Sequence, residues 1–362
     1  MIKRRDFIRQ SALGTGAMLT SHLFNNKKDS AMGIALVGLG NYSTNQLGPA
    51  LQYTQNCELK GVVTGDFQKG KAWSEKYGFP VKNIYNYENF DDLEHNDEIE
   101  IIYIVLPNFM HHEFTIRALR AGKHVICEKP MAITAIDAQE MVDEAEKQAR
   151  YLQVGYRLYF EPHHLAVQQR IRENGLENLR LMEASLGFDM ARPGLWRIDK
   201  DKGGGGAIID LGLYAIQAAR RSKNALPVKV RSHGQTIRKD LFKGIYENMY
   251  WQLEFPDGTV CNSSTSYSTY IDRFYASQKS LWCELNPSFN ATGAKAMTND
   301  GPLEVDGVLP YQQIAQMDEF VMAIRQGRPS IARGQEGVID VKIVQAIIKS
   351  AQEEKEIYLD WN

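Results

Sequence analysis

A glycine-rich turn between an apolar strand and a helix is the feature that most constrains the fold of this chain. Residues 33–37, Gly-Ile-Ala-Leu-Val, form a short apolar run that is typical of a buried parallel strand. The segment 38–43, Gly-Leu-Gly-Asn-Tyr-Ser, follows at once and leads into a helical stretch near Asn45. The first glycine permits a tight turn, the second lets a pyrophosphate approach the backbone, and the helix N-terminus favours the negative phosphates. The turn therefore predicts a dinucleotide-binding βαβ unit.

Strands and helices continue to alternate up to residue 155. Apolar runs predict strands at 59–64, 100–106, 124–127 and 152–155, and helical patterns predict helices at 69–77, 111–121 and 135–149. This alternation indicates an α/β fold with a doubly wound parallel sheet, which binds its ligand at the carboxyl ends of the strands. The expected fold class is thus an N-terminal Rossmann domain followed by a second domain.

The remainder of the chain is long enough for that second domain, because 362 residues exceed the typical domain length of roughly 100–150 residues. Apolar residues alternate with polar ones around 182–186 and 249–255, and the segment 256–259, Pro-Asp-Gly-Thr, is typical of a hairpin turn. An amphipathic helix over 337–354 is expected to pack back on the body of the protein. We place the Rossmann domain at 31–155 and an α/β domain at 156–362.

The first thirty residues are predicted to be a Tat-type export signal and linker. Arg4 and Arg5 precede Phe7 and Ile8, and a short apolar stretch follows. The stretch is far shorter than the ~20 residues that span a bilayer, so it is not expected to be a membrane span. The signal predicts a periplasmic or exported protein.

Charge and cysteine content exclude several function classes. The 42 Lys and Arg against 44 Asp and Glu give a net charge of −2, which provides no electrostatic reason to expect nucleic acid or an anionic membrane as partner. Four cysteines without a C-x-x-C pair exclude a disulfide scaffold and a zinc ribbon, although Cys261 and Cys283 could pair in an oxidising compartment. The histidines at 111–112 and 163–164 are adjacent and point in different directions, so we predict no metal site.

The end of the second predicted strand bears on the choice of cofactor. An NAD site usually has Asp or Glu there, whereas this chain has Thr64 and Gly65, with Lys69 a turn later. A hydroxyl, a glycine and a lysine accept the 2′-phosphate of NADP, which a carboxylate would repel. Asp66 is the alternative, because it could turn back to the ribose and restore a preference for NAD.

Several short motifs in order resemble those of the Gfo/Idh/MocA oxidoreductase family. They are Gly38-x-Gly40, Glu128-Lys129-Pro130, Gly155-Tyr156-Arg157, Trp196-Arg197, the glycines 203–206 and the segment from Asp210 to Tyr214. Within the family the chain is most similar to the glucose–fructose oxidoreductase type, on Thr64-Gly65, Leu106-Pro107-Asn108, the segment 266–269 and the export signal. The resemblance implies a second domain with a large open, mostly antiparallel sheet. It also implies a homodimer or homotetramer built through that sheet.

The resemblance also implies a catalytic group of Lys129, Asp210 and Tyr214. A lysine held near a cationic nicotinamide would have a lowered pKa and could exchange a proton with a sugar hydroxyl. Asp210 and Tyr214 are four residues apart and share one face of a helix, with Asp210 binding a sugar hydroxyl and Tyr214 serving as acid or base.

The expected substrate residues are Lys129, Tyr159, Asp210 and Tyr214. The expected cofactor residues are Gly38, Gly40, Asn41, Tyr42, Thr64, Gly65, Lys69, Leu106, Pro107, Asn108, His111, Glu128, Lys129, Arg157, Trp196 and Arg197. For Arg197 the alternatives are the 2′-phosphate and a surface ion pair. Tyr267 and Tyr270 could line a sugar site or face a sheet.

Together these features predict an NADP-dependent sugar oxidoreductase, with NAD as the other possible cofactor. Hydride would pass between the nicotinamide and the C1 of an aldose or a ketose carbonyl, in a ping-pong cycle with a retained cofactor. One alternative is a glycoside hydrolase that uses bound NAD transiently, and a second is a sugar sensor without catalysis.

Overall fold

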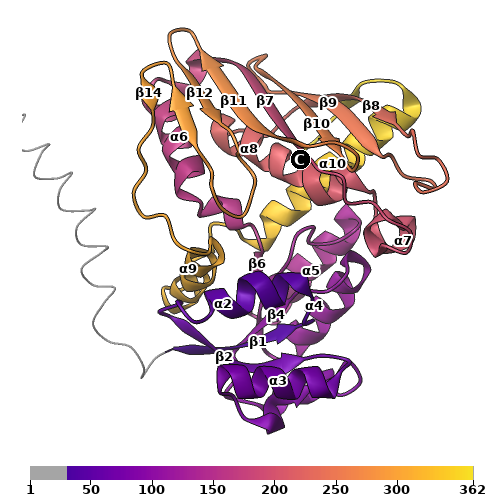
Figure 1. Cartoon of the computed structure of the whole chain (residues 1–362), viewed down its shortest axis with the longest axis vertical. Coiled ribbons are helices and arrows are strands. Elements are labelled where there is room, and N and C mark those ends of the chain that lie inside the picture. The colour runs from indigo at the N-terminus through magenta and orange to yellow at the C-terminus, as the bar shows by residue number, and fades with distance from the viewer. Residues whose placement is uncertain (1–30, 362) are drawn as a thin grey trace, which may run out of the picture.

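The computed structural model describes residues 31–361 and shows two sheets with helices packed on them (Figure 1). The predicted export signal at 1–30 lies outside the described residues. Within 31–361 no helix combines the length and the apolar character that crossing a membrane requires.

The first sheet is parallel and has the strand order β3-β2-β1-β4-β5-β6, which confirms the predicted Rossmann domain. Its strands are β1 (Met32–Val37), β2 (Cys57–Val63), β3 (Ile84–Tyr85), β4 (Ile101–Ile104), β5 (His124–Cys127) and β6 (Leu152–Val154). The helices between them are η1 (Ser43–Leu47), α2 (Gly48–Ala50), α3 (Phe67–Tyr77), α4 (His111–Arg120) and α5 (Ala135–Lys147). Every residue of β1 and β4 is buried, which explains why both strands lack polar alternation.

The second sheet has nine strands in the order β14-β13-β12-β11-β7-β10-β9-β8-β15, and all of its pairs except β7 with β10 are antiparallel. The strands are β7 (Leu179–Gly187), β8 (Lys229–Gln235), β9 (Asn248–Glu254), β10 (Val260–Ser266), β11 (Ile271–Gln278), β12 (Trp282–Leu285), β13 (Ala296–Thr298), β14 (Gly301–Pro302) and β15 (Ile357–Tyr358). Three helices, α6 (Pro162–Glu173), α8 (Leu213–Lys223) and α10 (Gly334–Glu353), pack on one face. Alternate residues of β9 and β11 are buried against these helices, as their period of two requires.

Helix α9 (Gln313–Arg325) belongs to the first domain by packing, although it follows the second sheet in the chain. Ile314, Met317 and Phe320 join the hydrophobic core that also contains Met32 and Trp73. Figure 1 shows α9 beside α2, at the edge of the Rossmann domain. The expected division at residue 155 therefore describes the order of the chain, whereas the first domain is completed by a later segment.

Cys261 and Cys283 lie on β10 and β12, with β7 and β11 between them. Strands about 4.8 Å apart place the two residues roughly 14 Å from each other, far beyond the ~7 Å limit between disulfide-bonded Cα atoms. Both thiols are buried and free. The pairing that the sequence left open does not occur in this fold.

Candidate active site

The glycine turn after β1 has the shape that a dinucleotide requires. Gly38 has a φ of +93°, and a Cβ there would lie 2.6 Å from the carbonyl oxygen of Val105, so only glycine fits. The Ser43 hydroxyl donates a 2.6 Å hydrogen bond to the Gly38 carbonyl and fixes the turn against the helix. A Cβ on Gly40 would meet no atom within 4 Å, which leaves an open cradle beside the backbone. Asn41 is exposed at the start of the helix. The turn therefore fits a pyrophosphate.

Asp66 does not compete for the ribose, because it caps α3. Its carboxylate accepts hydrogen bonds from the backbone N–H groups of Gln68 and Lys69 at 3.0 and 3.1 Å. The Thr64 hydroxyl oxygen accepts the Asp66 N–H at 3.2 Å, and the Lys69 side chain is exposed a turn further on. The alternative in which Asp66 binds the ribose is thus not supported by the structure.

Lys129 and Asp210 meet between the two domains. Lys129 lies in the loop after β5, before a cis bond to Pro130, and Asp210 lies in the helical turn η8 (Ile208–Gly212). The Lys129 Nζ donates to the Asp210 carboxylate at 2.7 Å and to its backbone carbonyl at 2.8 Å. Only 12% of the lysine side chain and 11% of the aspartate side chain are exposed. The structure thus joins two residues 81 positions apart, as expected for a shared catalytic group.

Two further groups bind the Asp210 carboxylate. The Tyr267 hydroxyl donates at 2.8 Å, and the Arg197 Nε lies 3.2 Å away. Burial raises the pKa of Asp210, but Lys129, Arg197 and the hydrogen bonds outweigh burial and lower the pKa to about 2. Asp210 is therefore a stable anion whose oxygens are already bound by the protein. One of these oxygens binds Lys129, and the expected contact of Asp210 with a sugar hydroxyl stays a prediction.

The protein groups around Lys129 raise its pKa, whereas the expected lowering depends on an adjacent nicotinamide and stays a prediction. Burial alone lowers the pKa, but the adjacent Asp210 carboxylate and Tyr214 outweigh it, and the pKa is raised. The sequence could not give the 2.7 Å contact that decides the sign. Lys129 is thus held as a cation at neutral pH.

Tyr214 lies in the first turn of helix α8, between two cations. The Lys129 Nζ and the Arg157 Cζ are each 4.8 Å from the centre of the Tyr214 ring, and Phe289 stacks at 6.3 Å. As the spacing of four residues predicted, Tyr214 faces the same region as Asp210, since both meet Lys129. Two cations therefore flank the Tyr214 ring.

Glu128 binds groups of the first domain, including the Lys129 backbone N–H at 3.3 Å. Its carboxylate accepts the Tyr103 hydroxyl at 2.7 Å, and that hydroxyl accepts from Gln316 of α9 at 2.6 Å. A Cβ on Gly155 would lie 2.5 Å from the Glu128 carboxylate, so the glycine makes room for it. Loss of hydration raises the pKa of Glu128 to about 7. Tyr42, another expected cofactor residue, likewise accepts a hydrogen bond from α9, from Gln313 at 2.8 Å.

The loop residues after β4 support the site from within the fold. Asn108 donates to the Gly203 carbonyl at 2.8 Å and thereby ties the first domain to the glycine-rich segment. The His111 ring lies between the carbonyls of Pro130 and Leu106, at 2.7 and 2.8 Å. These contacts hold the Lys129 loop and the end of β4 in place. Asn108 and His111, expected as cofactor ligands, are engaged with the protein, while Pro107 precedes them in the same loop.

The side chains of Arg157 and Tyr159 are also hydrogen-bonded to other residues of the protein. The Arg157 guanidinium donates to the carbonyls of Phe289 and Asn290 and to Gln312. The Tyr159 hydroxyl donates to Glu336 at 3.0 Å, and its ring is buried in the core of the first domain. The structure brings Arg157 to Tyr214 but does not bring Tyr159 to the Lys129 group, so the expected substrate role of Tyr159 is not supported.

Arg197 is an ion-pair partner of Asp210, and the alternative of a 2′-phosphate contact is not supported. Its guanidinium stacks 4.3 Å from the Trp196 ring, and its side chain is 35% exposed. Tyr267 contacts Asp210, but the sequence did not place it in this group. The sequence left open whether Tyr267 lines a sugar site or faces a sheet. The Ser-Tyr-Ser-Thr run at 266–269 was a signal for it, but its contact with Asp210 depends on tertiary structure.

A possible metal cluster lies apart from this group. The ligand atoms of His112, Asp137 and Glu140 lie within 4.8 Å of one another on the surface of α4 and α5, and His112 is 2.9 Å from Glu140. Exposed acidic groups are common without an ion, so the absence of a metal remains a prediction.

Two family sequence models match the chain on the two sides of this site. The oxidoreductase family GFO/IDH/MocA, NAD-binding Rossmann fold, matches residues 32–156. The GFO/IDH/MocA C-terminal domain matches residues 164–297.

Individual relatives agree with these matches. The chain is 34% identical to an aldose-aldose oxidoreductase from Caulobacter crescentus, solved as a complex with glycerol; the match has a TM-score of 0.88 and covers 91% of this chain and 100% of that one. It is 25% identical to an NADP⁺ D-xylose 1-dehydrogenase from Haloarcula marismortui, over 92% of this chain and 94% of the relative. It is 26% identical to a D-glucoside 3-dehydrogenase from Escherichia coli, over 89% and 96%.

Proposed function

Because the chain belongs to the GFO/IDH/MocA oxidoreductase family, we propose that it oxidises and reduces sugars by hydride transfer to and from NADP. The observation that carries the proposal is the Lys129–Asp210–Tyr214 group at the carboxyl end of the Rossmann sheet, where a nicotinamide ring would lie. The named activities of the relatives, an aldose-aldose oxidoreductase and a xylose dehydrogenase, support a sugar as substrate.

The chain's own residues account for the proton in this reaction. The turn at Gly38 and Gly40 would hold the pyrophosphate, and the bound nicotinamide supplies the acceptor or donor of the hydride. In the oxidation of an aldose, the C1–H bond breaks and its electron pair leaves with the hydrogen as hydride, while the proton of the C1 hydroxyl passes to the Tyr214 oxygen, which has first released its own proton to water. Lys129 donates a hydrogen bond to the sugar oxygen and stabilises negative charge on it and on Tyr214, while Asp210 fixes the lysine. Reduction reverses these steps.

The preference for NADP follows from the end of β2. Thr64 carries no charge there, Asp66 is occupied as the cap of α3, and Lys69 is exposed nearby. In this arrangement the Asp66 carboxylate accepts from the N-terminus of α3, while Thr64 and Lys69 can contact a 2′-phosphate. The relative from Haloarcula marismortui is named for NADP⁺.

The Thr64→Asp variant tests the cofactor and the reaction together. With a panel of aldoses, the wild type is expected to reduce NADP faster than NAD. The variant is expected to lose roughly a hundredfold in kcat/KM for NADP relative to NAD, because the new carboxylate faces the 2′-phosphate. The Thr64→Asn variant, which has the same shape without the charge, should retain the preference for NADP. An unchanged ratio of the two cofactors in Thr64→Asp would contradict this assignment.

The other finer parts of the proposal concern location, assembly and the kinetic cycle. We propose that the twin-arginine segment exports the protein to the periplasm, where no pool of NADP is available. That setting favours a ping-pong cycle in which one sugar is oxidised and another reduced on a retained cofactor.

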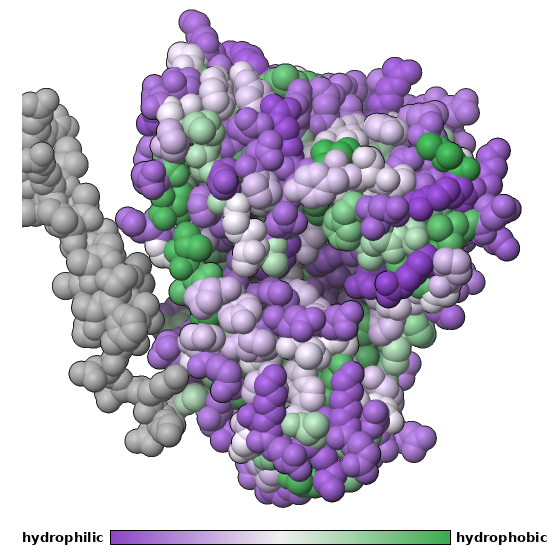
Figure 2. All heavy atoms as spheres, in the orientation of Figure 1, coloured by the Kyte–Doolittle hydropathy of each residue, from purple (hydrophilic) through white to green (hydrophobic). Residues whose placement is uncertain are grey.

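We also propose that the face of the nine-stranded sheet opposite α6, α8 and α10 joins subunits in a homodimer or homotetramer. Figure 2 shows a mostly hydrophilic surface in its view, with hydrophobic residues in scattered groups.

Two other functions would give different results in the same assay. A glycoside hydrolase would cleave an aryl glycoside without net change in the cofactor, and a sensor would bind sugar without turnover. The intact set of Lys129, Asp210 and Tyr214 favours the oxidoreductase.

A further inference from the structure

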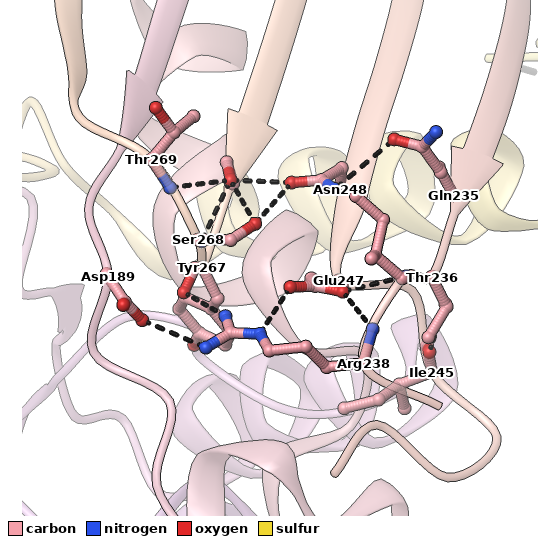
Figure 3. A network of polar contacts seen from close by, with 12 residues as sticks. Asp189, Gln235, Thr236, Arg238, Ile245, Glu247, Asn248, Tyr267, Ser268 and Thr269 are labelled. Carbon is pink, nitrogen blue, oxygen red and sulfur yellow. Dashed lines mark hydrogen bonds and ion pairs between the residues drawn. The ribbon is translucent and has the colours of Figure 1, made fainter. Parts of the chain in front are cut away.

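A second polar network lies behind the catalytic group, at the end of the second sheet (Figure 3). Its centre is the Glu247 carboxylate, of which only 1% is exposed. This carboxylate accepts the backbone N–H groups of Ile237 and Arg238, both at 2.8 Å, and the Arg238 Nε at 2.6 Å. The Arg238 guanidinium also reaches Asp189 at 3.2 Å. The pair therefore closes the loop between β8 and β9 around one buried charge.

The same pair holds Tyr267 by both sides of its backbone. The Tyr267 N–H donates to the Glu247 carbonyl at 3.1 Å, and the Tyr267 carbonyl accepts the Arg238 Nη2 at 2.9 Å. The Tyr267 ring stacks on Phe242 of this loop, with the ring centres 6.3 Å apart. Figure 3 shows Arg238 between Glu247 and Tyr267, with Asp189 at its other end. The backbone and ring of Tyr267 are thus fixed by one loop, which we call the 236–247 loop.

The hydroxyl of Tyr267 contacts the catalytic group. The Tyr267 hydroxyl donates to one oxygen of Asp210 at 2.8 Å, and the other oxygen of Asp210 binds the Lys129 Nζ at 2.7 Å. A continuous set of contacts therefore leads from Glu247 and Arg238, through Tyr267 and Asp210, to Lys129.

We propose that Arg238 and Glu247 are positioning residues for the reaction: they fix Tyr267, whose hydroxyl holds the Asp210 carboxylate that keeps Lys129 charged. This inference rests on the proposed function for its catalytic meaning, whereas its effect on Lys129 is a property of the fold. Neither Arg238 nor Glu247 contacts Lys129 directly in the network described, so both act through Tyr267.

The physical reason is the cost of keeping an ion pair out of water. Lys129 and Asp210 are both largely buried, and a buried pair stays ionised only when further hydrogen bonds satisfy its charges. Asp210 faces Lys129, Arg197 and Tyr267, and Lys129 faces Asp210, Tyr214 and Arg197. Without the Tyr267 donor the Asp210 carboxylate is no longer fixed beside Lys129, and an amine that loses this carboxylate gives up its proton at a lower pH.

The experiment measures the charge of Lys129 without relying on turnover. Competitive acetylation with acetic anhydride, read by mass spectrometry, gives the reactivity of the Lys129 amine relative to exposed lysines. Reactivity at a fixed pH follows the fraction of free amine, so a pKa lower by one unit gives roughly tenfold faster labelling. We expect about tenfold faster labelling in Tyr267→Phe and about threefold in Glu247→Gln, which loosens the tyrosine without removing its hydroxyl.

A double variant separates positioning from a general structural effect. Because Glu247 acts through Tyr267, the variant Tyr267→Phe/Glu247→Gln should label no faster than Tyr267→Phe alone. Arg238→Lys, which retains the charge but loses the fork that reaches Glu247 and the Tyr267 carbonyl, should resemble Glu247→Gln. Glu284→Gln is the matched control, since Glu284 accepts the Arg273 Nε at the same 2.6 Å in the same sheet. It should label like the wild type, and melting temperatures identify any variant that fails to fold.

The possible failures can be told apart. Wild-type labelling in both Glu247→Gln and Arg238→Lys, or additive effects in the double variant, would overturn the positioning role even if the enzyme oxidises sugars. Faster labelling in these variants together with no sugar oxidation by the wild type would retain the positioning role and refute the proposed function. In an active enzyme, the same variants should lower kcat more than they raise KM.

Discussion

The Lys129→Met variant is expected to lose roughly a thousandfold in kcat/KM for aldose oxidation. Methionine has a similar length and fills the same space, but it removes the cation that lies 2.7 Å from Asp210 and 4.8 Å from the Tyr214 ring centre. The sugar oxygen then develops negative charge without Lys129, and Tyr214 retains only Arg157 as a neighbouring cation. The measurement is initial-rate kinetics at saturating cofactor, with cofactor binding followed separately by fluorescence. Binding is expected to change little.

The matched control for this variant is Lys123→Met. Lys123 is also a buried lysine of the first domain, but its amine donates to the Asn96 carbonyl at 2.9 Å, away from the site. Its replacement should leave the rate per folded molecule unchanged. Sugar oxidation by Lys129→Met at close to the wild-type rate would mean that the proton path runs through other residues.

The Asp210→Asn variant is expected to lose roughly a hundredfold in kcat and to change the pH dependence. In the wild type the carboxylate raises the pKa of Lys129, so activity that needs the protonated amine persists into the alkaline range. Without this carboxylate, burial dominates and lowers the Lys129 pKa. Activity should therefore decline at a lower pH in the variant as the pH rises. The measurement is the pH profile of kcat over the neutral and alkaline range.

The direction of that change is the decisive result for Asp210. A rate that falls with no movement of the alkaline limb would mean that Asp210 binds the sugar and does not set the charge of Lys129. A limb that moves to higher pH would contradict the electrostatic role described for the pair. Tyr267→Phe provides an intermediate case, since it leaves the carboxylate in place and removes one of its donors.

The sequence predicted β1 and β4 well because each of them is a continuous, buried apolar run. It predicted part of the second sheet from the alternation in β7 and β9. It did not predict β3, β14 or β15, since two residues are too few to show a period. The return of α9 to the first domain was also missed, because an amphipathic pattern does not say which surface the apolar face will cover.

The group of Lys129, Asp210 and Tyr214 shows the same limit for single residues. Lys129, Asp210 and Tyr214 could be named from motifs, and the structure brings them together. The direction of the Lys129 pKa shift could not be predicted from motifs, because it depends on the distance between Lys129 and Asp210, which are far apart in the chain. Tyr267 lies 57 positions from Asp210, and no local pattern connects them. Several expected cofactor ligands, such as Asn108 and His111, turned out to hold the loops of the site together.

The most direct test of the central claim follows the hydrogen on the C1 of an aldose. An aldose deuterated at C1 is incubated with the wild-type enzyme and NADP, and mass spectrometry locates the deuterium. Hydride transfer at the Lys129–Asp210–Tyr214 group predicts deuterium on the nicotinamide ring, and then on a second sugar if the cycle is ping-pong, with neither product in Lys129→Met. Deuterium that stays on C1, whether the sugar is cleaved from a glycoside or only bound, would contradict the claim.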